Sequence, residues 1–107
     1  MLAVKLGIAA ALILAFAGPS QAQSPAEQRG LTFVRTNCSQ CHAIDKVSAS
    51  PLRIAPPFRT LHHMYPVESL EEALAEGIST GHPTMPEFRL DPDQIGNVIA
   101  YLKSLER

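Results

Sequence analysis

The sequence has no excess of charge of either sign and no basic patch. Its 107 residues include nine Lys and Arg against ten Asp and Glu, so the formal net charge is −1. Nucleic acids bind proteins that concentrate positive charge on one face. The charge balance therefore excludes nucleic acid as a partner, and it also excludes a strongly basic docking face.

The chain also lacks an apolar run long enough to span a membrane. Its longest run, residues 6–17, falls short of the roughly 20 apolar residues that a spanning helix needs. The run follows Lys5 and precedes small residues at Ser20 and Ala22, which is the pattern of a secretory signal peptide. We predict a signal peptide over 1–22, one mature domain over 23–107 without a membrane span, and a periplasmic location. An uncleaved anchor is the alternative.

Cysteine is equally scarce. The only two are Cys38 and Cys41, and His42 follows directly. Residues three apart lie on one side of a helical turn, so both thiols can reach the two vinyl groups on one edge of a haem. The imidazole can ligate iron through one nitrogen while the other donates a hydrogen bond. The motif therefore predicts one haem c attached to Cys38 and Cys41, with His42 as an iron ligand.

Other uses of two cysteines fit the sequence less well. A thiol–disulfide oxidoreductase needs a βαβ context, and the chain after the motif is rich in proline and has no run of β-branched residues. Zinc needs two further ligands, for which only His62, His63 and His82 remain. A disulfide between cysteines three residues apart closes too small a loop to stabilise a fold much. The oxidoreductase stays an alternative if no haem is attached.

Three segments carry the signals of helices, which predicts an all-α domain. Ser24, Ser69 and Asp91 are the expected N-caps, because each is followed three residues later by Glu or Gln. The helices are expected over 24–37, over 69–77 and from Asp91 onward. The last has an apolar stripe at steps of three and four residues, formed by Ile95, Val98, Ile99, Leu102 and Leu105.

In this order the motifs resemble a class I bacterial cytochrome c of the exported, single-haem kind. The resemblance covers residues 24–106 and implies a fold of about three main helices with long loops around one haem. It also implies that the N-terminal helix crosses the C-terminal helix at Gly30, eight residues before the first cysteine. Tyr101 matches the family's packing aromatic at this crossing. Val34 stands where the family usually has an aromatic residue.

The proline-containing loop after the haem motif also resembles that of the family. There, a proline carbonyl accepts the hydrogen bond of the axial histidine, a role that the resemblance gives to Pro56, with Pro57 as the alternative. Similar residues in the family pair with the haem propionates, which makes Arg53, Arg59 and Tyr65 candidates for that pairing.

The sixth iron ligand implied by the resemblance is Met85, which lies between prolines just ahead of the last helix. A thioether is a soft, neutral donor, and His/Met ligation raises the reduction potential of haem. Met64 and His82 are the alternatives. Met64 comes soon after His42 in the chain, and His82 would give a haem of lower potential.

These features predict an electron carrier and not an enzyme. With His42 and Met85 on the iron, no coordination site is free for a substrate. The expected partners are redox proteins, a donor and an acceptor, with the chain acting as a monomer or as a subunit of a dehydrogenase complex. The alternative is a haem-based gas sensor or a peroxidase-like enzyme with a displaceable sixth ligand.

Overall fold

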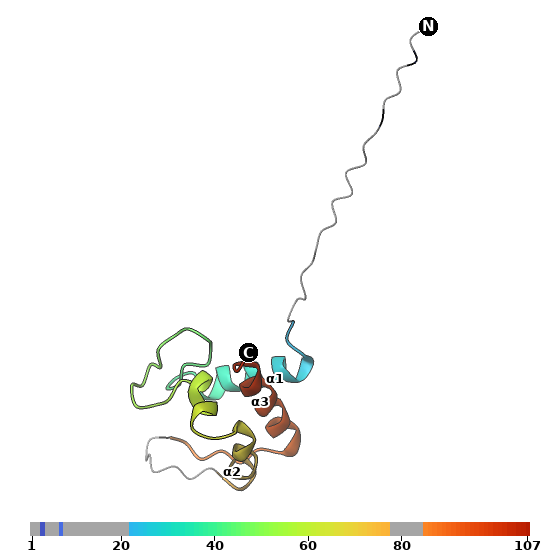
Figure 1. Cartoon of the computed structure of the whole chain (residues 1–107). Helices are drawn as coiled ribbons and strands as arrows, with labels where there is room; N and C mark the ends of the chain where they lie inside the picture. The colour runs from blue at the N-terminus through green and yellow to red at the C-terminus, as the bar shows by residue number, and fades with distance from the viewer. Residues whose placement is uncertain (1–2, 4–6, 8–21, 78–84) are drawn as a thin grey trace.

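The computed structural model describes residues 3, 7, 22–77 and 85–107 of the chain. These residues form helices and no strands, which confirms the predicted all-α fold with three main helices (Figure 1). The elements in chain order are α1 (Pro25–Asn37), the 3₁₀ helices η1 (Phe58–His63) and η2 (Val67–Ser69), α2 (Leu70–Glu76) and α3 (Pro92–Ser104). Most of the predicted signal peptide lies outside the described residues, and so does His82. No helix in the described part is both long and apolar enough to cross a membrane.

The two long helices begin where the capping residues predict. The hydroxyl of Ser24 accepts a hydrogen bond from the backbone N–H of Glu27 at 3.2 Å, with Pro25 as the first residue of α1. At α3, the Asp91 carboxylate accepts from the Gln94 N–H at 2.8 Å, and the Gln94 side chain accepts from the Asp91 N–H at 3.1 Å. Both predictions are confirmed, because a cap depends on residues that are neighbours in sequence.

The capping prediction at Ser69 is wrong. Ser69 has helical backbone angles and makes no capping hydrogen bond through its side chain. It is instead the last residue of η2, which leads directly into α2. Val67 at the start of η2 is almost completely buried, so tertiary packing holds this turn in helical geometry. The helix α2 ends before Gly77, whose φ of +103° favours glycine.

The loop after the cysteines is partly regular. It contains η1, although three prolines in the loop favour irregular structure. Pro57 precedes η1 with a φ of −59°, and its carbonyl accepts hydrogen bonds from both the N–H and the hydroxyl of Thr60. A proline at this position costs no hydrogen bond, because the first N–H groups of a helix have no partner inside the helix.

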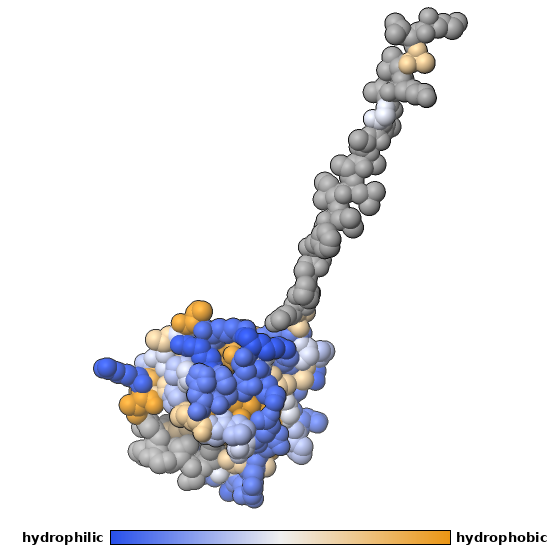
Figure 2. All heavy atoms as spheres, viewed as in Figure 1, coloured by the Kyte–Doolittle hydropathy of each residue, from blue (hydrophilic) through white to orange (hydrophobic). Residues whose placement is uncertain are grey.

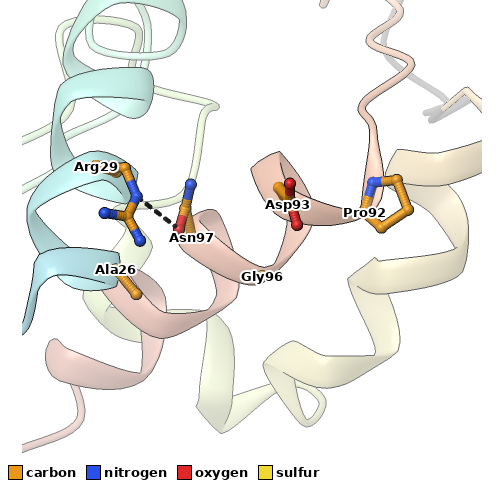
Figure 3. Close-up of a pocket in the computed structure, with 6 residues that line it drawn as sticks. All are labelled: Ala26, Arg29, Pro92, Asp93, Gly96 and Asn97. Carbon is orange, nitrogen blue, oxygen red and sulfur yellow. Dashed lines mark hydrogen bonds between the residues drawn. The ribbon is translucent and has the colours of Figure 1, made fainter.

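The helices α1 and α3 cross in direct contact at Gly30, as the resemblance implies (Figure 1). A Cβ added to Gly30 would overlap the carbonyl oxygen of Asn97 and would lie 2.7 Å from the Cβ of Tyr101. Only a residue without a side chain fits there. The Nε of Arg29 donates to the side-chain oxygen of Asn97 at 3.3 Å beside a groove of about 650 Å³ (Figure 3). None of the predicted site residues lines this groove.

The core is built mainly on α3. Its predicted stripe is confirmed, because Ile95, Val98, Ile99, Leu102 and Leu105 are all buried in one cluster. Val34 is completely buried in the same cluster, so a β-branched residue packs at the place where the family usually has an aromatic ring. The adjacent Phe33 contacts Phe88 edge to face, with ring centroids 6.3 Å apart. Outside the core, the face seen in Figure 2 is mostly hydrophilic, with apolar atoms in separate groups.

Replacing Gly30 by alanine should reduce the free energy of unfolding by roughly 1–3 kcal/mol, because the new methyl group overlaps the backbone of α3. The matched control is Gly96→Ala within α3, where an added Cβ meets nothing within 4 Å. That variant should be neutral or more stable by up to about 1 kcal/mol, because alanine favours helix. Denaturant unfolding of the two haem-loaded variants would measure the difference. Equal stabilities would contradict the close crossing.

Candidate haem site

Both cysteines and His42 lie in one turn at the C-terminal end of α1. The N–H of Cys38 donates to the carbonyl of Val34 at 2.8 Å, so Cys38 directly continues the helix. The N–H groups of Cys41 and His42 then donate to the carbonyl of Cys38, at 3.2 and 3.0 Å. This compact turn keeps the three donor side chains within a few residues of a helix that is anchored in the core.

The two thiols are free and half-buried. Burial raises the pKa of the Cys38 thiol to about 11, so Cys38 is a neutral thiol at pH 7. Cysteines that attack disulfides have depressed pKa values in an electropositive setting. The environment of Cys38 is the opposite of what a thiol–disulfide oxidoreductase needs.

The imidazole of His42 is oriented by a hydrogen bond. Its Nδ1 lies 2.8 Å from the carbonyl oxygen of Pro56. A carbonyl can only accept, so Nδ1 carries the hydrogen, and in the neutral tautomer with this bond the lone pair lies on Nε2. The neighbouring Pro57 carbonyl is used by Thr60. Of the two prolines considered from the sequence, Pro56 therefore makes the contact with His42.

Further backbone contacts hold the chain on either side of this histidine. The N–H of Leu52 donates to the carbonyl of Cys41 at 3.0 Å, and the N–H of Ala43 donates to the hydroxyl of Ser50 at 3.0 Å. From α3, the hydroxyl of Tyr101 donates to the carbonyl of Ile44 at 2.5 Å. Sequence reasoning assigned Tyr101 to the helix crossing and missed this second contact, which has no signature in the local sequence.

Phe58 is a second residue that sequence reasoning missed. Its ring lies against the ring of His42, with centroids 4.7 Å apart and an angle of 34° between the planes. The only signal in the sequence is its position two residues after Pro56, at the start of η1.

The candidates for propionate binding differ in their surroundings. Arg59 donates to the carbonyl of Ser48 at 2.6 Å and so joins η1 to the loop before it. Arg53 is exposed, and Tyr65 is half-buried against the core, where burial raises its pKa. None of these contacts tests the role in propionate binding, which stays a prediction.

The described histidines and methionines outside the haem motif differ in their surroundings. His62 and His63 stack with ring centroids 4.1 Å apart, and the Nδ1 of His62 is buried without a hydrogen-bond partner. Met64 is 59% exposed, whereas Met85 is half-buried. The structure therefore gives the two candidate thioethers different environments.

This donor set fits haem c. Two half-buried thiols three residues apart suit thioether attachment, and an imidazole with a free Nε2 and a bonded Nδ1 is in the form that binds iron. The cytochrome c family model matches residues 27–106 of the chain. The chain belongs to the cytochrome c family.

A relative described as cytochrome c6, from Picosynechococcus sp., is 33% identical over an alignment that covers 95% of this chain and 90% of the relative. No solved structure gives a significant match. As a member of the cytochrome c family, the chain carries covalently bound haem c. Family membership and this relative support a single-haem electron carrier.

The loop between His42 and η1 contains a carboxylate, that of Asp45, whose pKa is lowered. The Ser48 hydroxyl and the N–H groups of Ser48 and Val47 all donate to Asp45, which lowers its pKa from 3.8 to about 2. The charged form of Asp45 therefore closes the turn that presents the Ser48 carbonyl to Arg59. A carboxyl with a lower pKa in the folded state stabilises that state above its unfolded pKa.

We expect the contribution of Asp45 to stability to be present above about pH 4 and to be lost as the pH falls toward 2. Asp45→Asn should therefore flatten the loss of stability between pH 4 and 2, measured as the melting temperature of the haem-loaded protein. Glu76→Gln, an exposed change on α2, is the control and should leave the slope as it is in the unmodified protein. An unaltered slope in Asp45→Asn would contradict the assignment.

Proposed function

We propose that this chain carries single electrons between redox proteins outside the cytoplasm, with haem c attached to Cys38 and Cys41 and its iron ligated by His42 and Met85. The observation that carries the proposal is the hydrogen bond from His42 Nδ1 to Pro56, next to two unpaired thiols. Bound haem supplies a one-electron couple in which iron changes between the ferric and ferrous states. The protein supplies attachment, orientation and a dry environment.

The first task of the chain is attachment. The sulfur atoms of Cys38 and Cys41 form thioethers, which tie the cofactor to the C-terminal end of α1. Because α1 packs on α3, this tether is anchored in the main core. His42 offers Nε2 to the iron while Pro56 holds its Nδ1, which restrains the imidazole in either oxidation state.

Met85 is the better sixth ligand of the two described methionines. It belongs to the segment that leads into α3, and Phe88 in this segment contacts Phe33 on α1. In the same segment, the N–H of Leu90 donates to the carbonyl of Leu74 on α2 at 2.8 Å. These contacts hold the segment of Met85 against α1 and α2. Met64, which is largely exposed, lacks the shielding that suits a soft, neutral donor.

With His42 and Met85 both bound to the iron, no coordination site would be left for a substrate, so we propose a carrier and not an enzyme. Its partners are then a redox protein that donates the electron and one that accepts it.

Residues 1–22 are proposed to be a signal peptide that directs export and is cleaved after Ala22. We expect the haem-loaded protein recovered from the periplasm to begin at Gln23, as determined by N-terminal sequencing or intact mass. Haem-loaded protein that keeps residues 1–22 would contradict cleavage and would favour the uncleaved anchor.

The ligand assignment predicts a specific spectrum. The ferric protein should show c-type absorption bands and the weak near-infrared charge-transfer band of methionine bound to iron. Met85→Ala should abolish the near-infrared band and lower the reduction potential, because a soft thioether favours the ferrous state. The matched control is Met64→Ala, which should retain the band. Loss of the band in Met64→Ala but not in Met85→Ala would reverse the assignment.

A further inference from the structure

The ring of His42 is contacted by the chain in two ways, and both contacts come from one short segment. Its edge donates through Nδ1 to Pro56, and its face lies against Phe58. A hydrogen bond at one atom restrains the position of the ring edge, but it leaves the ring some freedom to rotate about the line of that bond. A second ring against the face removes this freedom. The two contacts together define the plane of the imidazole.

The backbone of Phe58 is hydrogen-bonded to the residue next to His42. Its N–H donates at 2.9 Å to the carbonyl of Ala43, the residue that follows His42. Ala43 is buried, and its own N–H is bound by Ser50. The backbone of Phe58 is therefore tied to the backbone beside His42, so the two rings keep their relative position when the loop fluctuates.

Phe58 also contacts the core. Its side chain packs against the main hydrophobic cluster, and Leu61 in the same 3₁₀ helix is buried in that cluster. Phe58 thus contacts both the imidazole and the core, so the packing of the core restrains the ring that lies against His42.

We propose that Phe58 is a positioning residue that sets the plane of the His42 imidazole about its bond to iron. This inference rests on the proposed ligation of iron by His42. The plane matters because the imidazole interacts electronically with haem iron in a direction that depends on the ring's rotation. The unpaired electron density of the ferric haem should therefore report the plane, even where the ligands themselves are unchanged.

The test uses the ferric holoprotein and the paramagnetic NMR shifts of the haem methyl groups, which depend on the orientation of the axial imidazole. Phe58→Leu and Phe58→Met keep an apolar side chain but remove the ring, and both should change the order or spread of the methyl shifts. Phe58→Tyr retains the ring and should keep the pattern of the unmodified protein. The matched control is Leu31→Ala, which trims another half-buried apolar side chain that packs against the same hydrophobic cluster from α1.

A pattern of methyl shifts in either ring-deleted variant that matches Leu31→Ala and the unmodified protein would overturn the proposal, because Phe58 would then serve only to pack the core. The near-infrared band distinguishes this outcome from failure of the ligand assignment. If the band persists while the methyl shifts stay unchanged, His42 and Met85 still ligate iron and only the role of Phe58 is wrong. If the unmodified protein lacks c-type bands, the proposed function itself fails.

Discussion

The crossing of α1 on α3 is the contact on which the haem site depends. Because Gly30 has no side chain, the backbone of α1 can lie directly against Asn97 and Tyr101 of α3. The direction of α1 sets the position of Cys38, which follows the last residue of the helix. Tyr101 also connects the crossing to the haem motif, since its hydroxyl donates to the carbonyl of Ile44 just beyond that motif. One residue of α3 thus contacts both the crossing and the backbone that follows His42.

Hydrogen bonds, more than apolar burial, organise the loop that faces His42. Val47 and Ile54 are 86% and 66% exposed, so parts of this loop contribute little to the core. Segments with few buried apolar contacts open easily unless polar contacts hold them. Here the Asp45 turn, the Ser50 hydroxyl and Arg59 each satisfy backbone groups of the loop. The loop that carries the Pro56 carbonyl consequently depends in part on a polar network, in which Asp45 loses its charge at low pH.

The helices show which structural features are local. Ser24 and Asp91 cap α1 and α3 as predicted, because a capping side chain bonds to residues only three positions away. Ser69 has the same local pattern and does not cap α2. The difference arises from Val67, which is buried in the core and begins the 3₁₀ turn over residues 67–69 that precedes α2. A sequence pattern thus predicts a helix end well only where no distant packing competes with it.

The sequence by itself determined the chemistry of attachment, since two thiols three residues apart and an adjacent imidazole lie in one turn of chain and need no distant partner to be recognised. It also determined the apolar stripe of α3, which follows from helical periodicity. The resemblance implied Pro56, with Pro57 as the alternative, as the partner of His42, but only the tertiary structure decided between the two prolines and added Phe58. The Pro56 carbonyl and the Phe58 ring reach His42 from 14 or more residues away, and the folding of the intervening loop brings them there.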